Sequence, residues 1–215
     1  MESSFYMGLL PAEVKFHNLI SPPGKEGITI QEATMTIQVG NYYEILSPRC
    51  TVLISTVDKE GRPNAAPFSF VTPVSSNPPL VLFAAAPTRH TLANVRETGE
   101  FVLNIVPEEL LDKLWVCSKA FARGVSEIAQ AGLTERRSRR VKPPSIEECL
   151  GWIECRLEFE KEAGDHILVI GRVVNTEVKE AFIEDGKFDV SQAKPIMHIS
   201  GRRFVAAERI VYARG

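Results

Sequence analysis

Alternation of apolar and charged side chains is clearest between Trp152 and Glu160. The apolar positions are Ile153, Cys155, Leu157 and Phe159, and the charged positions between them are Glu154, Arg156, Glu158 and Glu160. A period of two predicts a strand with one buried face and one solvated face. Turn residues follow at Ala163-Gly164-Asp165, and further strands are expected at His166 to Val174, near Asn175 to Val178 and at Phe204 to Val211.

Short β-type runs also fill the part of the chain that follows Cys50. They are Thr51 to Val57, Ala65 to Val71, Leu80 to Ala86 and Phe101 to Val106. Between the first two, Asp58-Lys59-Glu60-Gly61 predicts a tight hairpin, because Asp and Gly suit backbone positions with positive φ. Many short strands with few helices favour a barrel.

Three short helical segments are expected among these strands. His90 to Thr98 is amphipathic and is followed by Gly99, a plausible helix end. Pro107 opens a second helix. A helical turn is predicted at Ser145 to Leu150, because Ser145 with Glu148 three residues later matches a capping box.

Length and composition indicate one globular domain. The 215 residues are 44% hydrophobic and 24% charged, close to globular averages. Residues 1 to 33 are irregular in pattern and are expected to form an N-terminal extension, with a single domain over residues 34 to 215. The chain contains no run of ~18 apolar residues and no export signal, so we expect no membrane span and a cytoplasmic location.

Charge and cysteine spacing narrow the class of partner. A net charge of −2 gives no reason to expect a nucleic acid or an anionic membrane, and favours a small-molecule partner. Four cysteines, at positions 50, 117, 149 and 155, show no C-x-x-C spacing. We therefore expect buried thiols rather than a disulfide framework or a metal site. Signatures of hydrolases, zinc proteases, P-loop proteins and Rossmann domains are absent from the sequence.

Small residues and a proline mark the segment from Asn64 to Ser69. Small side chains allow a flat ligand to approach the backbone, and Pro67 lacks a ladder donor, which places its strand at an edge or a bulge. The segment is therefore either an ordinary edge strand or a ligand site.

Hydroxyl and basic groups gather at the start of the helix that begins at His90. Thr88, Arg89, His90 and Thr91 would suit a phosphate group, because a helix N-terminus presents free N–H groups. The alternative is plain capping by Thr88 with a solvated Arg89.

The remaining charged groups are less specific. A lone histidine at His166 is more often structural than functional, and His17 and His198 are assigned no role. The basic run from Arg136 to Lys142 is either a solvated loop or a seat for the 2′-phosphate of NADPH.

Taken together and in order, these motifs resemble the flavin reductase-like family of FMN-binding split barrels. The segments that carry the resemblance are Pro48-Arg49, Ser55-Thr56-Val57-Asp58, Gly61 to Phe70, Ser75 to Val81, Thr91 to Val95, Gly99 to Asn104, Ala131 to Thr134, Lys142-Pro143-Pro144, Gly164-Asp165-His166 and Gly171-Arg172-Val173. Together they cover about residues 42 to 210.

The resemblance implies a mainly β fold with short helices, a six-stranded Greek-key FMN-binding split barrel that forms a homodimer. It implies FMN contacts at Ser55, Asn64, Ala65, Ala66, Pro67, Phe68, Ser69, Ser76, Arg89, His90, Thr91 and Asn94. His166 matches a histidine near the flavin and the nicotinamide and is the candidate catalytic residue.

The activity that the resemblance implies is hydride transfer from NAD(P)H to FMN, with electrons passing to a monooxygenase, a redox protein or another acceptor. One alternative is a flavoredoxin-like FMN carrier that does not turn over NAD(P)H. Another is a ligand-binding barrel without turnover.

Overall fold

The computed structural model describes residue 34 and residues 36–214, so the expected N-terminal extension lies outside the described residues. The strands are β1 (Arg49–Cys50), β2 (Val52–Val57), β3 (Pro63–Phe68), β4 (Val71–Ser76), β5 (Pro79–Ala85), β6 (Glu100–Ile105), β7 (Glu135–Arg136), β8 (Ser145–Ile146), β9 (Gly151–Ala163), β10 (His166–Val178), β11 (Ile183–Glu184), β12 (Lys187–Phe188), β13 (Ile196–Ser200) and β14 (Arg203–Ala206). The helices are η1 (Val39–Asn41), α1 (Tyr42–Ile45), α2 (His90–Thr98), η2 (Glu108–Leu110), α3 (Leu111–Cys117), α4 (Glu127–Gln130), η3 (Glu180–Phe182) and α5 (Val190–Ala193). None of the helices in these residues is long and apolar enough to cross a membrane.

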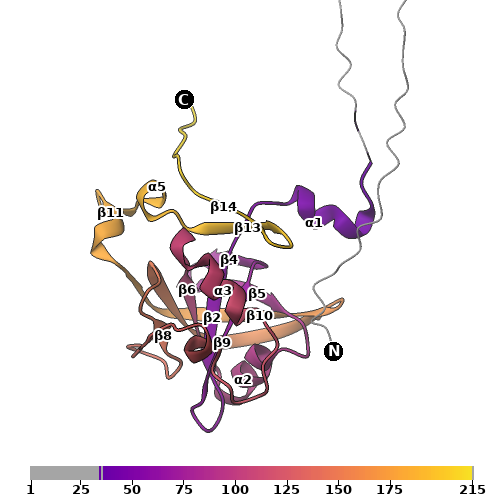
Figure 1. Ribbon diagram of the computed structural model, residues 1–215, viewed down its shortest axis with the longest axis vertical. Helices are drawn as coiled ribbons and strands as arrows, with labels where there is room; N and C mark the ends of the chain where they lie inside the picture. The colour runs from indigo at the N-terminus through magenta and orange to yellow at the C-terminus, as the bar shows by residue number, and fades with distance from the viewer. Residues whose placement is uncertain (1–33, 35, 215) are drawn as a thin grey trace, which may run out of the picture.

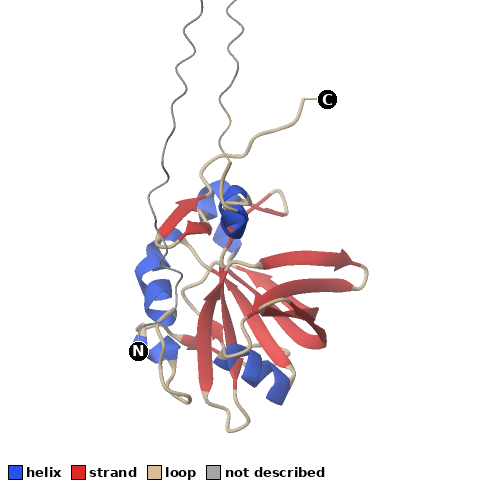
Figure 2. Cartoon of the chain, turned by 90° about the vertical axis from the view of Figure 1, so that its right-hand side faces the viewer, coloured by secondary structure: helices blue, strands red, loops and turns tan. Residues whose placement is uncertain are grey.

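The main sheet has seven antiparallel strands in the order β3-β2-β6-β9-β10-β5-β4. It curves around a common interior, and β3 contacts β5 as well as β2 (Figure 2). A second sheet joins β1, β13 and β14. This small sheet lies at one end of the molecule and α2 lies at the other (Figure 1).

The barrel interior is one apolar cluster that draws on most strands of the main sheet. Its buried members are Val52, Ile54, Phe68, Val81, Phe83, Ala85, Leu92, Val95, Phe101, Leu103, Cys155, Ile167 and Val169. Leu92 and Val95 belong to α2, so this helix covers one end of the interior. A second cluster on the outside includes Leu53 and packs β2 against α3 and α4, which is why all six residues of β2 are buried.

Three phenylalanine rings run through the interior edge to face. The ring centroids of Phe68 and Phe83 are 5.1 Å apart, as are those of Phe83 and Phe101. The ring of Phe101 lies against the backbone of Gly171, where an added Cβ would come within 2.3 Å of the Phe101 Cζ atom. Gly171 therefore allows β10 to pass the aromatic row.

A polar network ties the start of β3 to two helices. The buried Glu127 carboxylate of α4 accepts hydrogen bonds from Asn64 Nδ2 at 2.8 Å and from the Ala65 N–H at 3.2 Å. The Asn64 side-chain oxygen accepts in turn from Thr91 of α2 at 3.1 Å. Asn94 donates to Thr56 of β2 at 3.0 Å. Every group named here is buried, so the network holds β3 in register with α2 and α4.

Several local predictions are confirmed. The helix at His90–Thr98 has the predicted bounds and ends at Gly99, whose φ is 72°. Gly61 has φ 80° in the hairpin between β2 and β3, where its N–H donates to the Asp58 carbonyl at 2.9 Å. β3 is an edge strand, as the proline at position 67 predicts. Three of the four cysteines are buried, and Cys50 is exposed.

The sheet has one strand more than the six expected for the barrel. Val71–Ser76 forms β4 and pairs with β5, and the sequence patterns did not predict this strand. The predicted strand from Ala65 to Val71 instead ends at Phe68. An edge strand such as β4 needs hydrogen-bond partners on one side only, so it tolerates a proline and exposed side chains.

The predicted alternation along β9 fails at two positions. Glu154 is fully buried rather than solvated, because its carboxylate accepts backbone N–H groups from Arg139 at 2.9 Å and Arg140 at 2.6 Å. Phe159 is 54% exposed although it was expected in the core, since the pairing of β9 with β6 ends at Arg156 and β9 has a bulge between Leu157 and Phe159.

Other boundaries also differ. The helical turn predicted from Ser145 is wrong, because Ser145–Ile146 is a strand and Glu148 accepts from Thr134 instead of capping a helix. The two strands expected between His166 and Val178 form one strand with bulges. The last predicted strand is shorter, at Arg203–Ala206, and pairs with the unforeseen β13.

The contact between Gly171 and Phe101 yields a stability prediction. Replacing Gly171 by alanine should lower the free energy of unfolding by about 1 to 3 kcal/mol, because the new Cβ would overlap the Phe101 ring. Urea denaturation measures the change. Gly40→Ala is the matched control, since no atom lies within 4 Å of a Cβ at that glycine and its φ is not positive. Equal stability of the two variants would contradict the prediction.

Glu127 yields a prediction about pH. Burial raises the pKa of this carboxyl above its ordinary value of 4.5. A group of this kind contributes most to stability when protonated, and the contribution is lost as pH rises through the raised pKa. The free energy of unfolding of the wild type should therefore fall relative to that of Glu127→Gln as pH rises above 4.5.

The control for that experiment is Glu109→Gln, at an exposed position of η2. This change removes a carboxylate without touching the buried network. Parallel pH curves for the wild type and Glu127→Gln would show that Glu127 ionises equally in the folded and unfolded chain.

Candidate functional site

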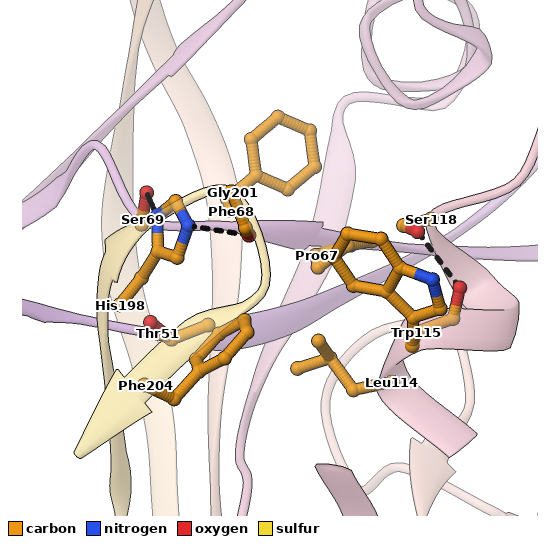
Figure 3. Close-up of a pocket in the computed structure, with 10 residues that line it drawn as sticks. All are labelled: Thr51, Pro67, Phe68, Ser69, Leu114, Trp115, Ser118, His198, Gly201 and Phe204. Carbon is orange, nitrogen blue, oxygen red and sulfur yellow. Dashed lines mark hydrogen bonds between the residues drawn. The ribbon is translucent and has the colours of Figure 1, made fainter. Parts of the chain in front are cut away.

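A cavity of about 80 Å³ opens between the end of β3, α3 and the β13–β14 hairpin (Figure 3). Its lining residues are Thr51, Pro67, Phe68, Ser69, Leu114, Trp115, Ser118, His198, Gly201 and Phe204. Three of the expected cofactor-binding residues, Pro67, Phe68 and Ser69, thus lie on one wall.

The walls of this cavity suit a flat ring. Pro67, Trp115 and Phe204 present planar or rigid apolar surfaces from three different elements (Figure 3). Because β3 ends the main sheet, its backbone groups on the outer side have no ladder partner there. The cavity therefore combines apolar surfaces with backbone hydrogen-bonding groups along one edge.

Its polar side is built on His198. The Nδ1 atom of this histidine lies 3.2 Å from the Ser69 hydroxyl oxygen, and Nε2 lies 3.1 Å from the Gly201 carbonyl oxygen (Figure 3). Arg49 approaches the same Nδ1 atom with Nη2 at 3.4 Å. Burial and the charge of Arg49 lower the pKa of His198, so the ring is neutral at pH 7.

His166, the candidate catalytic residue, does not line the cavity. It lies at the start of β10, where Nδ1 is 2.7 Å from the Asp165 carboxylate. Its ring centroid is 5.6 Å from that of Phe70, and the Cζ atom of the Arg49 guanidinium lies 5.7 Å from the same Phe70 centroid. The histidine is therefore linked to the polar side of the cavity through Phe70 and Arg49.

A second, smaller hollow of about 10 Å³ lies at the other end of β3. Its lining residues are Asp58, Arg62, Pro63, Asn64, His90, Asn94, Arg123, Gly124 and Val125. The expected phosphate group would meet His90 there, while Arg89 is exposed at the N-cap of α2 without a side-chain capping bond. Plain capping by Thr88 is thus not what the helix start uses, because the N-cap residue is Arg89.

Cations at this hollow already have partners. Arg62 pairs with Asp58 at 2.7 Å and with Glu60 at 2.9 Å, and Arg123 pairs with Glu97 at 2.5 Å. A ligand phosphate would have to compete with these carboxylates for the guanidinium groups. His90 and Arg89 are the basic side chains at the helix start that form none of these ion pairs.

The structure does not bring the other expected residues into either cavity. Ser55 is buried and donates to the Pro144 carbonyl at 2.5 Å. Ser76 is exposed at the turn between β4 and β5. Thr91 is buried in the network with Asn64, and Ala65 gives its N–H to Glu127. Ala66 packs on the barrel interior.

The basic run is attached to the barrel. The Arg136 guanidinium stacks on Trp152, with its Cζ atom 4.2 Å from the ring centroid, and pairs with Glu177 at 3.1 Å. Arg139 also pairs with Glu177, at 2.8 Å. The backbone at Arg139 and Arg140 donates to the buried Glu154. Two arginines of this run thus form ion pairs with Glu177 of β10. In the solvated loop that the sequence favours, these side chains would face water instead.

The sequence patterns did not predict the side of the cavity that α3 and the β13–β14 hairpin supply. His198 was given no role, and Trp115 and Phe204 were not singled out as site residues. Arg49 was noted only in the resemblance. No local pattern marks these residues, because they meet only when three segments of the chain come together.

Comparisons with known proteins agree with this architecture. The family model described as flavin reductase like domain matches residues 46–204. An uncharacterised protein of Methanothermobacter thermautotrophicus is 39% identical over 166 residues, which is 74% of this chain and 78% of that protein. A flavin reductase of Pseudomonas putida is 30% identical over 132 residues, covering 61% of this chain and 74% of its own length.

Among solved structures, nitrilotriacetate monooxygenase component B from Bacillus cereus superposes with a TM-score of 0.76 at 28% identity, covering 84% of this chain and 99% of that one. The expected mainly β split-barrel fold is confirmed by such matches. With the family model spanning most of the described residues, the chain belongs to the flavin reductase like domain family.

Proposed function

We propose that this protein binds FMN and transfers a hydride from NAD(P)H to it, passing the electrons to a flavin-dependent partner or another acceptor. The observation that carries the proposal is the flat-walled cavity at Pro67 to Ser69 on the open edge of β3, in a chain of the flavin reductase family. Solved relatives of the same fold include FMN-binding proteins, which supports FMN as the flavin.

The two hollows suit the two ends of FMN. One lies at Asn64 and the other reaches Ser69, and five residues of extended strand separate them by ~17 Å. An elongated molecule with a flat ring at one end and a phosphate at the other could reach both hollows by passing Ala65, where Glu127 occupies the outer edge of β3. In this arrangement Pro67, Phe68 and Ser69 would hold the ring and Arg89 with His90 would hold the phosphate.

When bound, FMN would supply the hydride chemistry, so the residues of this chain have to bind and orient. Backbone groups on the outer edge of β3 would fix the ring. Trp115 and Phe204 would exclude water from its apolar face. His166, held by Asp165 and tilted against the Phe70 ring, is positioned to orient the nicotinamide ring.

A homodimer and a monooxygenase partner complete the proposal. Large apolar side chains are exposed on η1, on α1 and directly after α1, namely Val39, Tyr42, Ile45 and Leu46. Such a cluster on a short helix beside the barrel suits burial against a second copy (Figure 1). The similarity to a monooxygenase component supports a flavin-dependent oxygenase as the electron acceptor.

The first experiment records flavin binding and reduction. FMN added to the purified protein should bind with a shift in its visible spectrum, and NADH or NADPH should bleach it rapidly without oxygen. Binding without bleaching by either nucleotide would replace the reductase by an electron carrier of the flavoredoxin type. A protein that does not bind FMN would overturn the proposal.

The phosphate site has its own test. Replacing both Arg89 and His90 by alanine should weaken FMN binding at least ~10-fold, because a charge-assisted phosphate contact contributes about 1.5 to 3 kcal/mol. Fluorescence titration measures the affinity. Riboflavin, which lacks the phosphate, is the control ligand and should bind the variant and the wild type equally. Unchanged FMN affinity would move the phosphate site away from α2.

A further inference from the structure

Arg49 is a partly buried cation with neutral partners. Its Nη1 donates to the Tyr43 carbonyl and its Nη2 to the Ile199 carbonyl at 2.7 Å. Its Nε atom is buried and has no hydrogen-bond partner among the described residues. Arg49 also forms no ion pair with the described residues. The nearby Glu44 carboxylate lies 4.0 Å from Arg203 instead.

An arrangement of this kind leaves the guanidinium without a paired carboxylate. A partly buried guanidinium stays protonated in proteins, and here its direct contacts are carbonyl oxygens, a neutral imidazole and two aromatic rings, while the Glu44 carboxylate lies nearby without pairing with it. Burying such a charge without a carboxylate costs free energy, so an anionic group nearby would be stabilised by it. The positive charge of Arg49 therefore indicates a ligand that is negatively charged or becomes negatively charged.

His198 connects Arg49 to the cavity. A guanidinium can only donate hydrogen bonds, so the Nδ1 atom of His198 that faces Arg49 has to be the acceptor. The ring hydrogen therefore sits on Nε2, which donates to the Gly201 carbonyl. Nδ1 also faces the Ser69 hydroxyl at the wall of the cavity. Arg49 thus stands one hydrogen bond behind His198 and two behind Ser69, both of which line the cavity.

We propose that Arg49 is a positioning residue that fixes His198 and Ser69 at the cavity and stabilises the negative charge that the flavin ring gains on reduction. The inference rests on the proposed function, because it places the flavin ring at this cavity. Arg49 needs no contact with the ring for this role. Its charge acts through a partly buried region in which Coulomb attraction is stronger than in water.

The test compares the reduction potential of bound flavin in three variants. Arg49→Gln removes the charge and should weaken binding of reduced flavin at least tenfold more than binding of oxidised flavin, which lowers the midpoint potential by about 30 mV. Arg49→Lys keeps the charge and should retain most of the wild-type potential. Arg203→Gln, on β14 at the far edge of the same small sheet, is the matched control and should leave the potential unchanged.

Using FMN and riboflavin side by side separates the ring from the phosphate. An equal shift with both flavins supports a role at the ring. A loss of affinity for FMN alone, with the potential unchanged, would assign Arg49 to the phosphate and overturn the proposal. An unchanged potential in folded Arg49→Gln would overturn it too.

A second measurement needs neither a variant nor flavin. Nitrogen NMR of histidine in the wild-type protein should show His198 neutral at pH 7, with its hydrogen on Nε2. A protonated ring, or a hydrogen on Nδ1, would contradict the arrangement on which the proposal depends. If this measurement succeeds and FMN does not bind to the wild type, then the proposed function fails while the Arg49–His198 pair stands.

Discussion

The edge-to-face contact of Phe68 with Phe83 connects the site to the centre of the barrel. Phe68 belongs both to the interior cluster and to the wall of the cavity, so the end of β3 is held by the same packing that stabilises the fold. The row continues through Phe101 to Gly171, where the absence of a side chain lets β10 close the barrel. An edge strand without such an anchor would be free to fray, because it has ladder partners on one side only.

The outer edge of β3 divides into two parts. Toward the start of the strand, Asn64 and the Ala65 N–H are bound to Glu127, and the cost of burying that carboxylate is offset by hydrogen bonds that lock the strand against α2 and α4. Toward the end of the strand, Pro67, Phe68 and Ser69 border the cavity. Rigid support beside a stretch of edge strand that faces a cavity is what a binding site for a flat cofactor requires.

Charge is distributed unequally around this strand. Near α2, the guanidinium groups of Arg62 and Arg123 are neutralised by carboxylates, while at the cavity Arg49 has only neutral partners. The basic run is different again, since Arg136 and Arg139 converge on Glu177 and their loop is anchored by the buried Glu154. Of these basic groups, Arg49 is the one whose charge is least compensated by carboxylates and is most available to a ligand.

What the sequence determined by itself was local. The helix from His90 to Thr98 and the hairpin at Gly61 follow from periodicity and from glycines that adopt positive φ, and both are decided within a few residues of the chain. The order of motifs added the family and its split barrel, and the proline at position 67 marked the edge strand.

Only the tertiary structure decided which polar groups are buried and which segments share the cavity. Glu154 sits at a solvated position of its strand pattern and is buried because a loop some fifteen residues earlier needs an acceptor. Arg49 and His198 are 149 positions apart and meet because β1 pairs with β13. Neither event leaves a local signal, since a side chain's solvation depends on what folds over it and not on its neighbours in the chain.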